Sequence, residues 1–244
     1  MTDLSQTDFL PGAVVALAFA VVARGLRAVT DGGAIAGAII AFILIVGGGP
    51  WAFVPLMAVF FLTLIATRWR AEDKRTLGIA ERRGGRDAGQ VLANLGASVL
   101  CAAAAFAFPN RSAQLMVGAM AVFAEAAADT VSSETGQAAS SQPRMILGFR
   151  PAPVGTNGAV SPQGTFAGCI AAAIVAWIAV ICGVVASRWA PVIALTAILG
   201  MLFDSVMGEI FENRGRMGND AVNFVSTVLA ADLALLIVFL SQRV

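Results

Sequence analysis

The sequence contains no histidine, and in 244 residues it has one lysine, Lys74, and three cysteines. Without histidine the chain has neither the commonest general base nor an imidazole for metal binding. Any chemistry must therefore use Asp, Glu, Arg, Lys74, hydroxyl groups and amides. The cysteines all lie in apolar segments, at spacings that match neither a zinc site nor a disulfide framework. We therefore interpret them as small hydrophobic residues.

Charged residues are also scarce, at 13% against about 25% in a typical soluble domain. Hydrophobic residues make up 58%, and the mean hydropathy is +0.82. This composition predicts an integral membrane protein, with residues 1–244 forming a single membrane domain. The net charge of +1 gives no argument for a nucleic-acid partner. The opening MTDLSQTDF has no basic residue and so lacks the positive region of a cleaved signal peptide. We expect the first apolar segment to be a retained span.

Eight apolar segments are candidates to cross the membrane, since a spanning helix needs about 17 to 25 mostly apolar residues. The expected fold is an all-α polytopic bundle of seven or eight transmembrane helices. The segment GAIAGAIIAFILIVGGG is short and Gly-rich, so it is the candidate for a half-span. The predicted spans are residues 9–29, 33–47, 51–67, 90–108, 112–131, 164–186, 190–211 and 221–241.

The positive residues divide unequally between the two sides of this topology. With the amino terminus outside, thirteen Lys and Arg residues, Arg82 and Arg83 among them, fall on one side, and only Arg111, Arg188 and Arg243 fall on the other. Because positive loops stay in the cytoplasm, we expect the first side to be cytoplasmic and the protein to lie in a bacterial inner membrane. The inner loops, near residues 68–90, 132–163 and 211–220, hold nearly all the polar residues, so the cytoplasmic face should carry the active site.

The first inner loop is cationic and contains the sequence RGGRD, which ends at Asp87. Its arginines would serve as a topology determinant with affinity for anionic lipid headgroups. Alternatively, glycines beside Arg86 would allow a close backbone approach to a bound anion. Asn94 follows about one turn into the next span, where an amide is costly unless it is paired.

Acidic residues end two spans that run in the same direction. Glu125 and Asp129 are four residues apart and share a helix face, and the fifth span ends in DTVSSE where the seventh ends in DSVMGE. The likeness indicates a weak internal duplication or a chance similarity. Because ionisable groups inside spans are costly and usually functional, we interpret Asp129 and Asp204 as functional. In the predicted topology seven polar residues lie near the same membrane face: Asn94, Asp129, Glu134, Asp204, Glu209, Asp220 and Asn223.

Oxygen ligands from several helices suit Mg²⁺ bound to phosphate. A Walker A sequence is absent. The segment VGTNGAVSPQGT could take its place, with backbone amides and the side chains of Thr156 and Asn157 around phosphates. The tripeptide TNG is equally typical of an ordinary turn.

At this point several motifs together resemble a known family. ADTVSSETG, PRMIL and PVGTNGAVSPQGT, with RGGRDAGQVLANLG upstream and LFDSVMGEIFENRG and GNDAVNFVSTVL downstream, are similar to the phytyl-phosphate kinase family of membrane proteins, which includes transmembrane protein 19. The resemblance implies a membrane kinase of tocopherol and quinone precursor supply. It would transfer a phosphoryl group from a nucleoside triphosphate, CTP being favoured, to an isoprenoid monophosphate such as phytyl or geranylgeranyl phosphate.

The family's motifs fall on particular residues of this chain. The DT-x-x-SE pattern begins at Asp129, and the Gly-Thr-x-Gly pattern begins at Gly155. Val154 stands before it, where the family usually has Pro. The L-x-D-S pattern includes Asp204, and the ND-x-x-N pattern includes Asp220. We expect Asp129, Asp204 and Lys74 to be catalytic, and Mg²⁺ to be bound by Asp129, Glu134, Asp204 and Asp220. The nucleotide or its phosphates would be bound by Arg86, Asn94, Thr130, Ser133, Gly155, Thr156, Asn157, Gly158 and Asn223.

Two other classes of function remain open. One is a CTP-dependent prenol kinase or cytidylyltransferase, and the other is a transporter or lipid-binding membrane protein. A monophosphate acceptor has a second pKa near 6 and needs no general base, whereas an alcohol would need one, for which Asp129 and Asp204 are the candidates. Transporters usually place their site near the bilayer midplane, whereas these acidic groups cluster at one face. The oligomeric state is not indicated.

Overall fold

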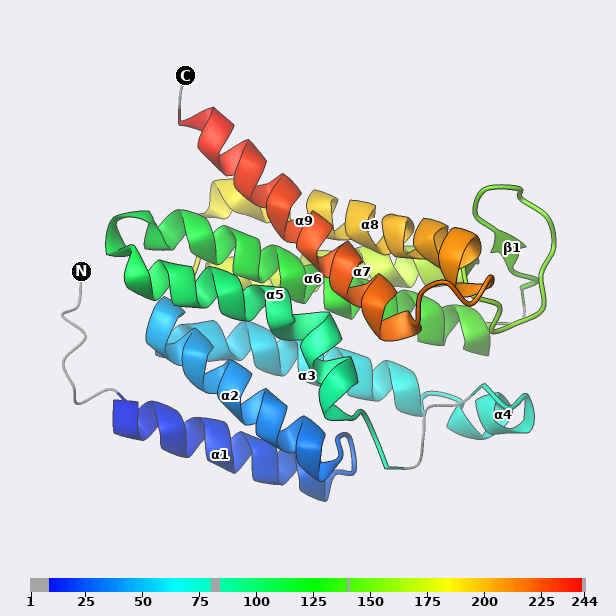
Figure 1. Ribbon diagram of the computed structural model, residues 1–244, viewed down its shortest axis with the longest axis horizontal. Coiled ribbons are helices and arrows are strands. Elements are labelled where there is room, and N and C mark those ends of the chain that lie inside the picture. Colours follow the sequence, from blue (N-terminus) through cyan, green and yellow to red (C-terminus); the bar gives the residue numbers. More distant parts are fainter. Residues whose placement is uncertain (1–8, 80–83, 140, 243–244) are drawn as a thin grey trace.

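The computed structural model describes residues 9–79, 84–139 and 141–242. Within them almost all regular structure is helical (Figure 1). Two short strands, β1 (Arg144–Met145) and β2 (Ala159–Val160), form an antiparallel pair. The helices are α1 (Phe9–Gly25), α2 (Asp31–Gly48), α3 (Phe53–Arg68), α4 (Ala71–Thr76), α5 (Ala88–Ala107), α6 (Ser112–Ala138), α7 (Pro162–Ile181), α8 (Ala190–Met207) and α9 (Asn219–Ser241).

The predicted all-α membrane bundle is confirmed. Seven helical segments of the described chain are long and apolar enough to cross a membrane. One of them is Asp31–Gly48, with 18 residues, so the segment expected as a possible half-span forms a helix of spanning length. The shorter helix is α1, whose 17 residues end at Gly25 and not at 29. Beyond it Arg27 has a φ of 55°, a left-handed conformation that ends a helix.

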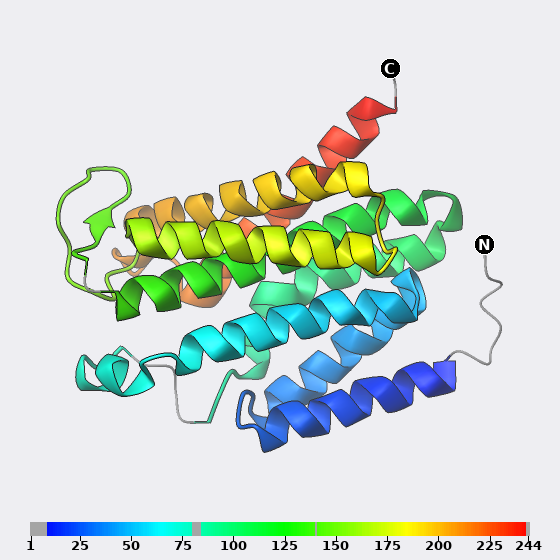
Figure 2. The same cartoon turned by 180° about the vertical axis from the view of Figure 1, so that it is seen from behind.

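Helix α6 forms the centre of the bundle, in contact with α3, α5, α7, α8 and α9 (Figures 1 and 2). Its span is 78% buried, whereas the other six spans are 33% to 44% buried. Every residue from Met116 to Ala128 is buried, as expected of a helix that is apolar on all sides. Many of these residues are alanine, and small side chains let neighbouring helices approach closely.

The contact between α6 and α7 depends on a Gly-x-x-x-Gly pair, Gly164 and Gly168. A Cβ atom added at Gly164 would lie 2.5 Å from the carbonyl oxygen of Ser132, and one added at Gly168 would lie 2.8 Å from that of Ala128. Both distances are shorter than van der Waals contact, so only glycine permits this approach. The beginning of α7 is therefore held against the polar end of α6.

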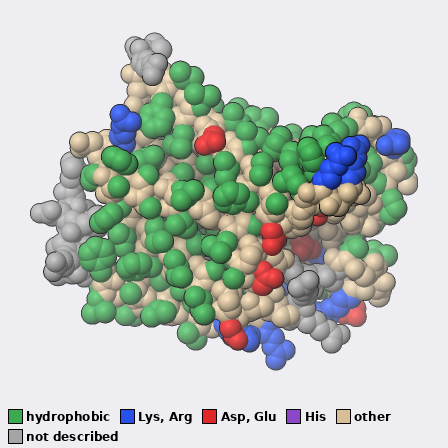
Figure 3. All heavy atoms as spheres, viewed as in Figure 1, with side chains coloured by type: hydrophobic (Ala, Val, Ile, Leu, Met, Phe, Trp, Pro, Cys, Tyr) green, Lys and Arg blue, Asp and Glu red, His purple; other side chains and the backbone are tan. Residues whose placement is uncertain are grey.

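The spanning helices alternate in direction, so one end of the bundle carries the long connections and the other carries both termini of the described chain (Figure 1). We call the first the loop end. It holds the ends of α1, α3, α6 and α8, together with α4 and the β1–β2 hairpin. Hydrophobic side chains spread over most of the face in Figure 3, and Lys and Arg gather mainly toward the loop end. Arg82, Arg83 and Arg243 lie outside the described residues.

Candidate functional site

Three carboxyl groups from α6 and α8 come together near the loop end. Asp129 and Asp204 lie within electrostatic range of each other, and Glu125, one turn before Asp129, interacts with both. Ser226 on α9 donates a hydrogen bond to Asp204 Oδ2 at 3.3 Å. Like charges in low-dielectric surroundings repel strongly, so the three carboxyl groups need protons or a bound cation to balance them. The structure thus places together the two aspartates predicted to be catalytic.

Glu125 belongs to this group, although the site residues predicted from the sequence did not include it. Its side chain is almost fully buried, and its Oε1 atom has no hydrogen-bond partner within the described part of the chain. Gly200 on α8 makes room for it, because a Cβ atom there would lie 2.6 Å from Glu125 Cγ. The signal in the sequence was its spacing of four residues from Asp129. We call Glu125, Asp129 and Asp204 the carboxylate group.

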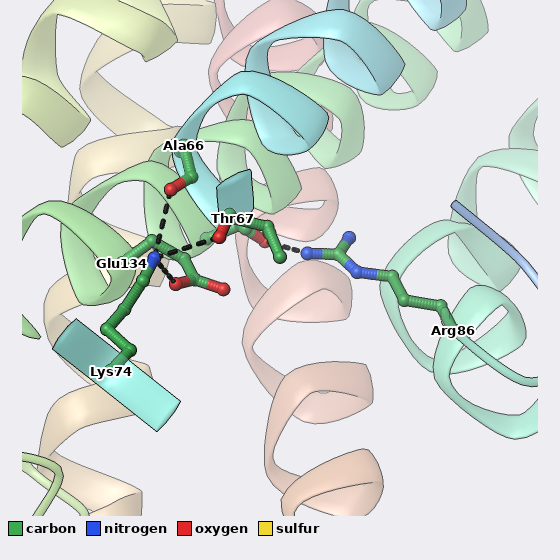
Figure 4. A network of polar contacts seen from close by, with 6 residues as sticks. Ala66, Thr67, Lys74, Arg86 and Glu134 are labelled. Carbon is green, nitrogen blue, oxygen red and sulfur yellow. Dashed lines mark hydrogen bonds and ion pairs between the residues drawn. The ribbon is translucent and has the colours of Figure 1, made fainter. Parts of the chain in front are cut away.

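Arg86 approaches this group from the loop before α5. Its Nη2 donates to Thr130 Oγ1 at 3.2 Å, and its guanidinium lies within electrostatic range of Asp129. The backbone of Arg86 is fixed by two hydrogen bonds to the α1–α2 loop: its N–H donates to Ala28 at 3.0 Å, and its carbonyl accepts from Thr30 at 2.9 Å. Figure 4 shows its side chain extending toward α6. Arg86 and Thr130, both predicted to bind phosphate, therefore lie in direct contact.

The glycines of RGGRD have a structural role in placing Arg86. Gly85 has a φ of 79°, and a Cβ atom there would lie 2.4 Å from the carbonyl carbon of Ala28. The close backbone approach expected for an anion is thus made, in this structure, to the α1–α2 loop. Asp87 and Gln90 then cap α5 reciprocally, each side chain accepting the other's backbone N–H at 3.0 Å.

Lys74 and Glu134 form a buried ion pair between α4 and α6 (Figure 4). Lys74 Nζ donates to Glu134 Oε2 at 2.5 Å, to the Ala66 carbonyl at 3.1 Å and to the Thr67 carbonyl at 3.0 Å. An ammonium group has three donors, so all three are used inside the protein. In this arrangement Lys74 has no donor left for a phosphate, and Glu134 faces Lys74. The pair joins α4 and the end of α3 to α6.

The loop between Pro143 and Ser161, which we call the Gly-rich loop, is attached to the π-helical turn Gly208–Glu212 that follows α8 and to the residue after it. Asn213 Nδ2 donates to the carbonyl of Asn157 at 2.8 Å, and the Leu147 N–H donates to Glu209 Oε2 at 2.9 Å. Gly158 has a φ of 75°, and a Cβ atom there would lie 2.6 Å from the Ser205 carbonyl oxygen. The Thr156 hydroxyl donates to Pro153 in a turn. Residues that follow Asp204 therefore hold the predicted phosphate loop in place.

A small polar cavity of about 60 Å³ separates this loop from α6. Asp129, Ser133, Gly155, Ser161 and Ser205 are among its lining residues. Hydroxyl groups beside a carboxylate suit a hydrated metal ion or a phosphate oxygen. A cavity of this size has room for a few water molecules. The site therefore has polar groups of the expected kinds around a space of this size.

Three other predicted site residues make different contacts, although Asn223 is connected to the carboxylate group, because the Ser226 hydroxyl lies within hydrogen-bond distance of both Asp204 and the Asn223 carbonyl. Asp220 is exposed, and its Oδ2 lies beside Gly89 at the start of α5. Asn94 is buried and donates to the carbonyl of Gln90 at 2.8 Å, while the Asn223 carbonyl accepts from Ser226 at 2.9 Å.

Within the described residues, no three or more His, Cys, Asp or Glu side chains are arranged as a metal site. Mg²⁺ usually takes only one or two protein carboxylates, with water and phosphate supplying the remaining ligands. Asp129 and Asp204 fit that need. Of the four predicted metal ligands, they are the two that the fold brings together.

The fold is that of an integral membrane protein. The carboxylate group and Arg86 form a cluster of charged side chains near one end of its helical bundle. Residues 14–231 match the family described as "Integral membrane protein DUF92", and the chain belongs to that family. The family membership expected from the motifs is thus confirmed. No solved structure matches the chain.

Relatives occur in bacteria, archaea and plants. The chain is 32% identical over 186 residues to an uncharacterized membrane protein of Synechocystis sp., with 75% of this chain and 72% of the relative covered. It is 29% identical over 220 residues to an uncharacterized membrane protein of Methanocaldococcus jannaschii, with 86% of each covered. It is also 30% identical over 200 residues to Protein VTE6, chloroplastic, of Arabidopsis thaliana, with 77% of this chain and 59% of that protein covered.

Proposed function

We propose that this protein is a membrane kinase that transfers a phosphoryl group from a nucleoside triphosphate, with CTP favoured, to an isoprenoid monophosphate. The product would be the diphosphate of a lipid such as phytol or geranylgeraniol. The observation that carries the proposal is the meeting of Asp129 and Asp204 beside Arg86 at the loop end. Family membership, similarity to VTE6 and the motifs around these residues support the same function.

The reaction needs positioning and charge neutralisation more than acid–base chemistry. An oxygen of the lipid phosphate attacks the γ-phosphorus, the bond between that phosphorus and the β–γ bridging oxygen breaks, and the nucleoside diphosphate leaves with the bonding electron pair. The attacking phosphate is largely dianionic at neutral pH, because its second pKa is near 6. No proton has to be removed in the transition state. Phosphoryl transfer of this kind depends on groups that neutralise the charge on the phosphate oxygens.

The residues of the site divide these tasks. Asp129 and Asp204 would hold Mg²⁺, which when bound supplies positive charge to the transferring phosphoryl group. Arg86, with its backbone fixed and its guanidinium beside Thr130, would neutralise phosphate charge as a pre-oriented planar donor. Glu125 would support cation binding through the Oε1 atom that it places behind the two aspartates.

The donor nucleotide would bind between the Gly-rich loop and α6. The cavity of about 60 Å³ between this loop and α6 is too small for a nucleotide. We therefore expect the loop between Pro143 and Ser161 to open and then close on the triphosphate, as lids do in many transferases. The contacts of Asn213 and Glu209 with this loop are those that would break or shift.

The loop end would face the cytoplasm, where nucleoside triphosphates are available. The excess of Lys and Arg at this end supports that orientation by the positive-inside rule. In a bacterium, the protein would then lie in the inner membrane.

Turnover by purified protein in detergent tests the proposal. The assay supplies Mg²⁺, a nucleoside triphosphate, and in turn a prenyl monophosphate or the matching alcohol. We expect diphosphate from the monophosphate, and a loss of at least about 100-fold in Asp129→Asn or Asp204→Asn, the size of effect seen when one stabilising group of a transition state is removed. Asp232→Asn, which removes an exposed carboxyl group of α9 outside the site, is the matched control. Product from the alcohol alone would favour a prenol kinase and overturn the proposal.

A further inference from the structure

A second and larger cavity lies on the other side of α6. It measures about 390 Å³ and is enclosed mainly by α1, α2, α3 and α5. Figure 2 shows α1, α2 and α3 on one side of α6, and α7 and α8 on the other. We call this space the α1–α5 cavity. Its volume lies within the range of about 300 to 1,000 Å³ typical of ligand sites, whereas the polar cavity beside the Gly-rich loop is much smaller.

One part of the α1–α5 cavity is lined by apolar side chains. Phe19 of α1, together with Leu56, Val59, Phe60 and Leu64 of α3, lines it. Gly33 and Gly37 of α2 also line it, and a Cβ atom added at Gly37 would meet nothing within 4 Å. The absent side chain at Gly37 therefore leaves open space. An apolar wall of this kind suits an aliphatic chain, since moving CH₂ groups out of water is favourable.

The other part of the cavity carries positive charge. Arg27, Arg68, Arg75 and Arg86 line it, and among the described residues no Asp or Glu does. Two of them make neutral contacts: Arg68 donates to the Leu26 carbonyl, and Arg86 to the Thr130 hydroxyl. Arg75 is paired with Glu72 on the outer surface. The guanidinium groups of Arg27, Arg68 and Arg86 have no ion-pair partner among the described residues that line this space and call for an anion, and Arg is the residue best suited to bidentate binding of phosphate.

We propose that the α1–α5 cavity is the acceptor site, which binds a phosphate monoester of a single long hydrocarbon chain. The phosphate lies among Arg27, Arg68 and Arg86, and the first part of the chain lies along Phe19 and Phe60. Membrane phospholipids share the same chemistry of phosphate and hydrocarbon. A monoester dianion matches these three positive groups better than a phospholipid diester, which has a single negative charge, and one chain fits this volume better than two. The assignment rests on the proposed kinase function.

The position of Arg86 connects this cavity to the carboxylate group. Arg86 lines the cavity, donates to Thr130 and lies within electrostatic range of Asp129, which lines the polar cavity on the opposite side of α6. A phosphate held by Arg86 is therefore adjacent to the place where the nucleotide phosphates and metal would bind. In this arrangement the lipid and the nucleotide approach the end of α6 from different sides, so neither has to leave for the other to enter.

Photo-crosslinking in the absence of nucleotide tests the location directly. The probe is geranylgeranyl monophosphate with a diazirine on its chain, and the labelled peptides are mapped by mass spectrometry. We expect label on α1 and α3, displaced by unlabelled geranylgeranyl phosphate. Gly37→Trp, which fills the cavity, should reduce labelling at least tenfold, whereas Ile39→Trp on the exposed side of α2 should leave it unchanged. Equal displacement by phosphatidylglycerol would overturn the preference for a monoester.

Kinetics separate this inference from the kinase proposal. Arg27→Gln should raise KM for the prenyl phosphate about tenfold or more, with kcat and the nucleotide KM unchanged. Arg24→Gln is the control, because Arg24 lies one turn earlier, pairs with Asp31 and does not line the cavity. Turnover with label confined to α7, α8 or α9 would overturn the acceptor site and leave the kinase standing. Label in the cavity without turnover under any nucleotide would leave the lipid site standing and overturn the kinase.

Discussion

The Lys74–Glu134 ion pair yields the most quantitative prediction. Lys74 is 1% exposed, the Glu134 side chain is 11% exposed, and Lys74 makes three hydrogen bonds to α3 and α6. Lys74→Met leaves the Glu134 carboxylate without its cation and two carbonyl groups without their donor. Removing one partner of a buried ion pair costs about 3–5 kcal/mol, a large fraction of the roughly 5–15 kcal/mol that stabilises a typical folded protein.

The assay is thermal unfolding in detergent, in a background where the partly exposed Cys169 and Cys182 are replaced by alanine, followed with a thiol-reactive dye that then reports exposure of the buried Cys101. Lys74→Met should lower the midpoint clearly. Arg75→Met is the neighbouring control: it breaks an exposed pair with Glu72, and exposed pairs contribute only about 0–1 kcal/mol. The double variant Lys74→Met/Glu134→Met should regain much of the lost stability, because apolar residues often replace a buried pair at little cost.

The same variants separate two roles for Lys74. If Lys74 positions α4 against α6, as its contacts indicate, the double variant should regain prenyl-phosphate turnover along with stability. A double variant that is stable but inactive would refute this reasoning and restore the roles predicted from the sequence, catalysis by Lys74 or metal binding by Glu134. If the double variant is no more stable than Lys74→Met, the two side chains are not coupled in their contributions to the free energy of unfolding.

Two further predictions concern the segments that place the site. Gly85→Ala should impair folding and activity, because its Cβ atom would lie 2.4 Å from the carbonyl carbon of Ala28. Gly78→Ala is the control: Gly78 also has a positive φ, of 71°, but no atom of the described residues lies within 4 Å of an added Cβ atom, so only the smaller backbone cost is expected. Comparing the unfolding midpoints of the two variants separates the steric clash from the cost of the left-handed backbone. Asn213→Ala removes the hydrogen bond to the Asn157 carbonyl. It should raise the nucleotide KM several-fold and leave the prenyl-phosphate KM unchanged. Equal increases in both KM values would contradict the assignment of the Gly-rich loop to the nucleotide.

The sequence alone predicted the bundle well, because membrane spans depend on local composition. Residues 90–108 and 190–211 correspond closely to α5, which covers Ala88–Ala107, and to α8 with the helical turn that follows it. The prediction was less successful where tertiary contacts extend a helix. α6 continues to Ala138 and not 131, since its polar end packs against α4 and α7.

The site could be predicted only in part, for the same physical reason. Asp129 and Asp204 were identifiable because a carboxylate in apolar sequence is costly. The pairing of Lys74 with Glu134 crosses 60 positions and leaves no periodic signal in the sequence. The likeness of DTVSSE to DSVMGE also hid a difference: α6 continues through its copy as a regular helix, whereas Gly208–Glu212 after α8 forms a π-helical turn, a feature common near functional sites.

The most direct test of the proposed function follows the phosphorus atoms of CTP. Purified protein, Mg²⁺ and geranylgeranyl monophosphate are incubated with CTP labelled at the γ-phosphate, and in parallel with CTP labelled at the α-phosphate. The kinase account predicts label in the lipid diphosphate from γ-labelled CTP only, with the signal lost in Asp204→Asn. Lipid labelled from the α-phosphate would instead identify a cytidylyltransferase. An unlabelled lipid in both incubations, with ATP and GTP equally inactive, would contradict the central claim.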